Sequence, residues 1–189
     1  MKHQFALSRP PRAANHTIFL DRDGVVNQKA PEGDYVKSWQ EFVFLPSALQ
    51  ALSLFAAFHV RVVILTNQRG IALGRSSLSD LAFIHDNMTA VSEAAGGRID
   101  AIYFCPHDVG VCNCRKPAPG LLWEAFADFP NLTPSQIPLL GDSRSDLEAA
   151  RAAGVQPWHL TTESQTAPSD KAFPSLLAAA KYFVQACST

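Results

Sequence analysis

Short apolar runs alternate along this chain with longer segments in which apolar side chains recur every three or four positions. The short runs predict strands at 17–20, 61–66, 99–104 and 137–140, and a last one at 158–160 that closes the sheet. Helical spacing predicts helices over 46–58, 77–95, 118–129, 146–153 and 173–185. Strands that alternate with helices predict an α/β fold, with helices packed around a central parallel sheet.

Length and composition favour one compact domain. The chain has 189 residues, 47% of them hydrophobic, which is enough for a core on both faces of one sheet and too little for two full domains. We therefore expect a single domain over residues 1–189, with 1–16 as a flexible N-terminal segment. The net charge of −1 provides no basic surface, so neither nucleic acid nor a membrane is expected as a partner.

The chain also lacks sequence signals for membrane insertion or export. Its apolar stretches are interrupted well before the roughly 20 residues that a spanning helix needs. The first ten residues carry positive charge but only a three-residue apolar core, which is too short for a secretory signal. We therefore expect a cytoplasmic protein.

Two aspartates follow the first apolar run directly. Asp21 and Asp23 lie two positions apart, so on a strand both carboxylates would project to the same face. In that arrangement one carboxylate can attack a phosphate ester while the other transfers protons. Read alone, the segment is equally compatible with a turn, because Asp and Gly both favour turns.

Further polar residues stand where other predicted strands end or a helix begins. They are Thr66, Asn67, Arg115, Lys116, Asp142 and Asp146. In sheets of this kind the ligand site lies beyond the carboxyl ends of the strands, which is where Asp21, Thr66 and Asp142 fall. A hydroxyl and a lysine at such a site can stabilise a transferring phosphoryl group.

A cluster of cysteines and one histidine forms a second chemical signal. Cys105, His107, Cys112 and Cys114 lie within ten residues and match a four-ligand zinc site. Cys112 and Cys114 are too close in sequence for an unstrained disulfide. With four protein ligands no coordination position remains for water, so we expect the zinc to be structural. It would stiffen the loop over 105–114 that precedes Arg115 and Lys116.

These polar residues form four motifs, whose order along the chain is similar to that of the haloacid dehalogenase-like phosphohydrolases. The motifs are Asp21 with Asp23, Thr66 with Asn67, Arg115 with Lys116, and Asp142 with Asp146. The resemblance implies a Rossmann-like three-layer fold without a large cap domain, and a flap over 27–40 beside the active site. The lack of a large cap is compatible with a monomer. The roles it implies are Asp21 as nucleophile, Asp23 as acid and base, Thr66, Asn67, Arg115 and Lys116 as phosphate-binding residues, and Asp142 as a metal ligand.

Magnesium fits the chemistry that this resemblance implies. A phosphate dianion repels an attacking carboxylate, so a hard divalent cation must neutralise both. The ion would be bound by Asp21 and Asp142 and by the main-chain carbonyl of Asp23. Asp146 would support these ligands without binding the ion directly.

Within that superfamily the chain resembles most the D-glycero-D-manno-heptose 1,7-bisphosphate phosphatases. The matching segments are 21–27, 66–74, 105–107, 112–120 and 141–142. This branch implies removal of the 7-phosphate through an aspartyl-phosphate intermediate, in carbohydrate metabolism that serves lipopolysaccharide biosynthesis. Only four residues separate His107 from Cys112, however, an interval nearer to that of the histidinol-phosphate phosphatases. That branch stays open, as does the anomer of the sugar.

Two other classes of protein share parts of this pattern. A phosphoacceptor signalling domain uses acids, a threonine and a lysine around magnesium, but Asp23 is placed to promote turnover. A zinc-organised binding module without activity does not explain the complete acidic set. Cys187 and the remaining histidines have no partners at ligand spacing and receive no role.

Overall fold

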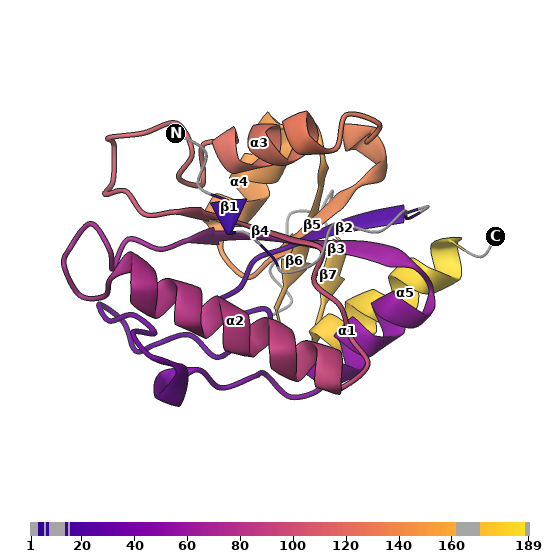
Figure 1. The fold of residues 1–189 in the computed structure, drawn as a ribbon. Helices are drawn as coiled ribbons and strands as arrows, with labels where there is room; N and C mark the ends of the chain where they lie inside the picture. The colour runs from indigo at the N-terminus through magenta and orange to yellow at the C-terminus, as the bar shows by residue number, and fades with distance from the viewer. Residues whose placement is uncertain (1–3, 6, 8–13, 15, 162–170, 188–189) are drawn as a thin grey trace.

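The computed structural model describes residues 4, 5, 7, 14, 16–161 and 171–187 and has an α/β architecture (Figure 1). Its strands are β1 (Gln4–Phe5), β2 (His16–Leu20), β3 (Val60–Asn67), β4 (Ala101–Cys105), β5 (Pro138–Gly141), β6 (Gln156–Leu160) and β7 (Lys171–Phe173). Its helices are α1 (Ala48–Ala57), α2 (Leu78–Ala94), α3 (Gly120–Asp128), α4 (Arg144–Ala152) and α5 (Leu176–Cys187), with short 3₁₀ turns at η1 (Trp39–Glu41) and η2 (Pro134–Gln136).

The described strands form a single sheet in the order β1-β4-β3-β2-β5-β6-β7. All neighbouring pairs are parallel except β1 with β4. Helices α1, α2 and α5 cover one face, and α3 and α4 cover the other (Figure 1). The strands alternate their side chains between two apolar cores, so that Ile18 packs on the first face and Phe19 on the second. The predicted three-layer α/β fold is confirmed.

Several predicted boundaries differ from those in the structure. The run at 158–160 belongs to β6, but it does not close the sheet, because β7 pairs with it in parallel. Phe173 ends β7, and the last helix begins only at Leu176. The prediction was wrong there because Phe173 is followed by Pro174 and Ser175, which end the strand before the apolar helical pattern starts.

Two residues of the predicted flexible N-terminal segment lie in a strand. Gln4 and Phe5 pair antiparallel with Tyr103 and Ile102 of β4. A two-residue strand has no periodicity that the sequence could reveal, and this one covers the edge that β4 would otherwise leave open. The rest of the predicted N-terminal segment, apart from Leu7, Ala14 and His16, lies outside the described residues.

Two helices begin with reciprocal caps that the sequence partly signals. Ser77 caps α2 by accepting a bond from the Asp80 backbone N–H. Helix α4 begins at Arg144 and not at Asp146, because Ser143 and Asp146 form the same kind of capping box. This box holds the Asp146 side chain near the carboxyl end of β5. No helix within the described ranges is long and apolar enough to cross a membrane.

Candidate active site

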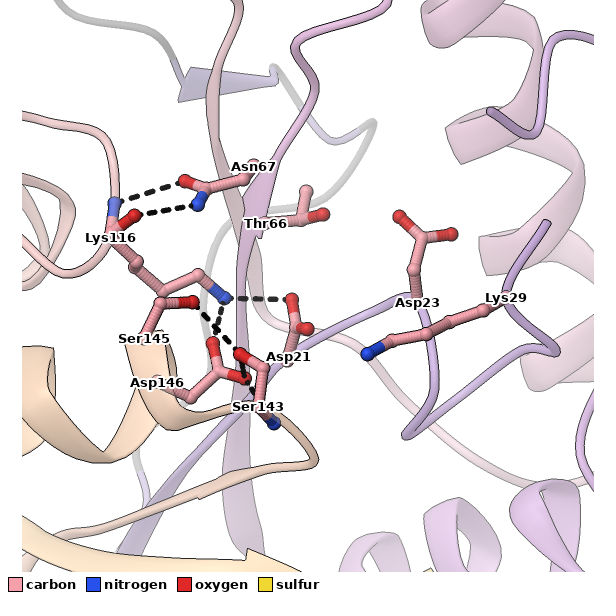
Figure 2. A pocket seen from close by; sticks show the side chains of 9 residues that line it. All are labelled: Asp21, Asp23, Lys29, Thr66, Asn67, Lys116, Ser143, Ser145 and Asp146. Atoms are coloured by element: carbon pink, nitrogen blue, oxygen red, sulfur yellow. Dashed lines mark hydrogen bonds and ion pairs between the residues drawn. The ribbon is translucent and has the colours of Figure 1, made fainter. Parts of the chain in front are cut away.

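The carboxyl ends of β2, β3 and β5 bring the predicted phosphate-related residues together. The backbone N–H of Asp21 donates to the Leu140 carbonyl of β5 at 3.0 Å, which fixes Asp21 at the end of β2. Thr66 lies near the end of β3, and Asp142 follows β5. Side chains from 21, 66 and 146 therefore meet over a single edge of the sheet (Figure 2).

A buried lysine links two of the acids. Lys116 Nζ lies 2.8 Å from Asp21 Oδ1 and 2.6 Å from Asp146 Oδ1, and it also donates to the Leu65 carbonyl at 2.7 Å. Burial acts to lower the pKa of Lys116, but the charges of Asp146 and Asp21 outweigh it and raise that pKa. Lys116 is therefore a permanent cation inside the site. It is 3% exposed, which excludes a freely solvated lysine.

The nucleophile candidate has a strongly perturbed carboxyl group. Burial, followed by the charge of Asp146, raises the pKa of Asp21 to about 7, although Lys116 acts in the opposite direction. Burial also acts to raise the pKa of Asp146, but the neighbouring Lys116 ammonium keeps it below its ordinary value. One buried lysine thus faces two carboxyl groups. Its single positive charge does not balance both of them, so a further cation would be favoured at this site.

Asp21, Asp142 and Asp146 satisfy a simple test for a cation site. One ligand oxygen from each lies within 4.8 Å of the others. Oδ1 of Asp142 is buried and has no hydrogen-bond partner among the described groups, so it is an unused oxygen ligand. Oxygen donors of this kind suit a hard cation such as Mg²⁺. The residues present therefore fit the ion that the sequence predicts.

Glycines at two positions allow the acids to approach. Gly24 has a φ of +92°, and a Cβ atom there would collide with the Asp142 carboxylate and with Lys29. At Gly141 a Cβ atom would collide with the Asp146 side chain. Both positions require glycine because the acids occupy the space that a side chain would fill. The Asp-Arg-Asp-Gly and Gly-Asp motifs thus have a steric basis.

Asp23 has a different environment from Asp21. It accepts hydrogen bonds from Arg22 Nη2 at 2.9 Å, from Asn27 Nδ2 at 2.9 Å and from Gln68 Nε2 at 2.9 Å. Burial acts to raise the pKa of Asp23, but the Arg22 charge and these hydrogen bonds lower it overall. Two carboxyl groups two residues apart therefore have pKa values shifted in opposite directions, as expected of groups with different chemical tasks.

Two adjoining cavities meet at Asp23. The first, of about 160 Å³, is lined by Asp21, Asp23, Lys29, Thr66, Asn67, Lys116, Ser143, Ser145 and Asp146 (Figure 2). The second, of about 240 Å³, is lined by Asp23, Lys29, Asn67, Gln68 and residues 30–36. Asp23, Lys29 and Asn67 line both. The second cavity lies along the segment predicted to be a flap.

The predicted phosphate-binding residues differ in position. Asn67 lines both cavities and also exchanges two 3.0 Å hydrogen bonds with the Lys116 backbone, so it holds the lysine-bearing loop in place. Arg115 lines neither cavity. Its Nη1 is buried without a hydrogen-bond partner among the described residues. A phosphate-binding role for Arg115 stays a prediction.

Sequence reasoning missed four residues that shape this site. Gln68 and Asn27 bind Asp23, Lys29 forms a 2.6 Å ion pair with Asp142 Oδ2, and Ser143 caps α4. Ser143 and Asp146 show the spacing of a capping box, which is a readable signal. Lys29 lies in a polar loop with no periodicity, so only the folded structure reveals its contact with Asp142.

The cysteine and histidine ligand candidates also come together. Cys105 Sγ lies 3.6 Å from Cys112 Sγ and 3.4 Å from Cys114 Sγ, and His107 Nδ1 lies 3.2 Å from Cys114 Sγ. Their ligand atoms all fall within 4.8 Å of one another. Four such groups around one centre match the donor set of a closed tetrahedral zinc site. The cluster begins at Cys105, the last residue of β4, and ends at Cys114, two positions before Lys116, so the same loop carries both the cluster and the lysine of the acidic site.

Comparisons with known proteins agree with this geometry. The HAD-hydrolase-like family matches residues 113–183. A D-glycero-beta-D-manno-heptose-1,7-bisphosphate 7-phosphatase from Bordetella bronchiseptica is 43% identical over 147 residues, which cover 77% of this chain and 80% of that protein. The chain therefore belongs to the haloacid dehalogenase-like hydrolases, and its curated relatives are phosphatases of that family.

A second relative and one crystal structure are also named as heptose 1,7-bisphosphate phosphatases. A D-glycero-alpha-D-manno-heptose-1,7-bisphosphate 7-phosphatase from Mycobacterium tuberculosis is 37% identical over 165 residues, covering 84% of this chain and 86% of that protein. The crystal structure of D,D-heptose 1,7-bisphosphate phosphatase from B. bronchiseptica, complexed with magnesium and phosphate, matches with a TM-score of 0.83. The two chains share 35% identity, with 90% of this chain and 99% of that one covered.

Proposed function

We propose that this protein is a magnesium-dependent phosphatase that removes the 7-phosphate of D-glycero-D-manno-heptose 1,7-bisphosphate through an aspartyl-phosphate intermediate. The observation that carries the proposal is the position of Asp23 where the two cavities join, with Asp21 and Lys116 lining only the smaller one. That arrangement suits a phosphoryl group in the first cavity, its leaving group in the second, and a proton donor between them. The named relatives support the choice of sugar.

Asp21 is the nucleophile in this proposal. Its carboxylate attacks phosphorus, a bond from Asp21 to phosphorus forms, and the bond from phosphorus to the sugar oxygen breaks. Lys116 holds the Asp21 carboxylate at 2.8 Å and places positive charge beside the transferring group. The hydroxyl of Thr66 and the amide of Asn67 line the same cavity and can donate to the phosphoryl oxygens.

Asp23 supplies the proton for the leaving oxygen and later removes one from the attacking water. The charge of Arg22 and three hydrogen-bond donors keep its pKa low in the protein alone. An arriving phosphate dianion places negative charge beside Asp23, which raises that pKa toward the protonated form that the first step needs. Asp23 is then ionised and accepts a proton from water in the second step, as the water oxygen bonds to phosphorus, the Asp21–phosphorus bond breaks and phosphate leaves.

Mg²⁺ and Zn²⁺ have separate places in the proposal. Asp21, Asp142 and the main-chain carbonyl of Asp23 would hold Mg²⁺, which supplies positive charge that reduces the repulsion between carboxylate and phosphate. Asp146 positions Lys116 beside them. Cys105, His107, Cys112 and Cys114 would hold a structural zinc that stiffens the loop before Lys116.

Histidinol phosphate is the second candidate substrate, because only four residues separate His107 from Cys112. Steady-state phosphate release with the alpha and beta anomers of heptose 1,7-bisphosphate and with histidinol phosphate decides between them. We expect the largest kcat/KM for one heptose anomer. A larger kcat/KM for histidinol phosphate would transfer the assignment to that branch. Release of no more than one phosphate per chain would instead support a phosphoacceptor domain.

A further inference from the structure

A fully buried arginine lies beside the proton-transferring carboxylate. Arg22 has no exposed surface, and its Nη2 donates to Asp23 Oδ1 at 2.9 Å and to Asp23 Oδ2 at 3.0 Å. A buried guanidinium needs partners for its remaining donors, since an unpaired buried charge is costly. Its second terminal nitrogen, Nη1, points away from Asp23 and finds one such partner on helix α2.

That partner is His85. His85 Nε2 lies 3.2 Å from Arg22 Nη1, and the imidazole has no exposed surface. A guanidinium only donates hydrogen bonds, so Nε2 must be the acceptor and the ring proton lies on Nδ1. Burial, and next the Arg22 charge, hold the pKa of His85 well below its ordinary value, with Asp23 acting weakly in the opposite direction. The ring therefore stays neutral and keeps its acceptor.

The surrounding elements fix the orientation of the His85 ring. Phe5 of β1 packs edge-on at 5.3 Å between ring centroids, and Phe104 of β4 packs at 6.3 Å. Nδ1 of His85 has no hydrogen-bond partner among the described groups. Its contact with Arg22 is thus the polar interaction that explains a buried histidine at this position. Substrate cannot reach His85, because neither active-site cavity is lined by it.

We propose that His85 is a positioning residue that acts through Arg22 to aim the Asp23 carboxyl group at the leaving oxygen. This inference rests on the proposed phosphatase function. In the first step the Asp21–phosphorus bond forms, the phosphorus–oxygen bond breaks, and the Asp23 proton moves to the leaving oxygen. If Nη1 loses its acceptor, Arg22 turns to find another and Asp23 turns with it. The proton transfer then suffers more than phosphate binding does.

Substrates with different leaving groups can reveal a misaligned Asp23. A sugar alkoxide is a poor leaving group that needs the proton, whereas p-nitrophenolate leaves well without one. Loss of Asp23 alignment should therefore reduce kcat/KM for the sugar phosphate far more than for p-nitrophenyl phosphate. General acid catalysis contributes about 10² to 10⁴ in rate, so partial misalignment should cost about tenfold or more. A variant that merely destabilised the fold would lower both values by the same factor.

Two amide variants provide a matched test. The amide of Gln reaches the position of Nε2, while the shorter amide of Asn reaches only that of Nδ1. We expect His85→Asn to lower kcat/KM for heptose 1,7-bisphosphate about tenfold or more, with less than about threefold loss for p-nitrophenyl phosphate. His85→Gln should restore most of the difference, because its carbonyl oxygen can accept from Arg22. Asp86→Asn, an exposed neighbour on α2, is the control and should change neither value.

The outcomes distinguish this inference from the proposed function. Equal losses for both substrates, or an unaltered ratio in His85→Asn, would overturn the positioning role. If His85→Asn does not fold, His85→Gln still tests the idea, because a change of about tenfold or more in the substrate ratio of that variant contradicts it. Lack of turnover in the wild-type protein with every phosphate ester would count against the phosphatase proposal itself. Thermal unfolding of each variant shows that the comparison is made on folded protein.

Discussion

Two clusters of metal-ligand side chains lie close together in this protein, and they differ in how completely the protein encloses them. Asp21 and Asp146 line an open cavity together with a buried lysine, and Asp142 adds a third carboxylate beside them. Cys105, His107, Cys112 and Cys114 face one another, and none of them lines either of the two active-site cavities. Three carboxylates beside a cavity leave positions for substrate, whereas four thiol and imidazole ligands leave none.

The open acidic site is suited to catalysis, and the enclosed cysteine cluster is suited to a structural role. The acidic site contains buried charges with opposing pKa shifts, which is typical of a catalytic centre. The cysteine cluster runs from the last residue of β4 into the loop before α3. Gly120, at the start of α3, packs so closely on this loop that a Cβ atom would collide with the Asn113 backbone. Asn67 then joins that loop to β3. The acidic site should exchange its bound metal ion readily, whereas the cysteine cluster should retain its metal ion.

The largest expected effect comes from removing the nucleophile. Asp21→Asn should lower kcat by about 10³-fold or more, because the amide cannot form the phosphoenzyme. The fold should survive, since Asn has a similar shape and removes one of two buried carboxyl groups around Lys116. Phosphate release measures the loss and circular dichroism measures the fold. Retention of wild-type turnover would contradict the assignment of Asp21.

A change in the cysteine cluster should instead affect stability. Cys112→Ser weakens zinc binding, which we expect to lower the free energy of unfolding by about 3 kcal/mol and the melting temperature by about 6 to 12 °C. Cys187→Ser is the control, because Cys187 lies in α5 outside the cluster. Metal content and differential scanning calorimetry provide the measurements. Equal melting temperatures for the two variants would remove the structural role of the cluster.

Magnesium binding at the acidic site should depend on pH. Burial, and then the Asp146 charge, raise the pKa of Asp21 to about 7, so a proton competes with the cation below that pH. The dissociation constant of Mg²⁺ should therefore increase as pH falls below about 7, by up to about tenfold per pH unit, and level off above it. Calorimetric titration at pH 6, 7 and 8 measures this dependence. A constant affinity over that range would argue against Asp21 as a ligand.

The smallest expected effect concerns Lys29. Its ammonium group lies 2.6 Å from Asp142 Oδ2 and competes electrostatically with a divalent ion at that carboxylate. Lys29→Gln should tighten Mg²⁺ binding in the absence of phosphate by about threefold, a modest change because Lys29 is half exposed. Lys37→Gln is the matched control, since Lys37 lies in the same loop and pairs with Asp34. Weaker Mg²⁺ binding in Lys29→Gln would show that Lys29 supports the site.

The sequence predicted the fold well, and it predicted candidate acids at strand ends, because both depend on local pattern. Apolar runs and helical spacing gave the central strands, and Asp21, Thr66 and Asp142 were identified from their positions at strand ends. The predictions failed for β1 and β7, which are two and three residues long and form by pairing with strands distant in sequence. Such short strands have too few residues to show a period.

The amino-acid order alone determined which side chains stand at the ends of β2, β3 and β5, and which four residues form the thiol and imidazole cluster. Only the tertiary structure decided how these groups affect one another. Lys116 reaches Asp21 across 95 positions of sequence, and Arg22 reaches His85 across 63. Burial and then the charge of Asp146, 125 positions away in sequence, raise the pKa of Asp21. Burial also acts to raise the pKa of Asp23, but the Arg22 charge and hydrogen bonds from Asn27 and Gln68 lower it, because electrostatic interactions depend on distance in space and not on separation along the chain.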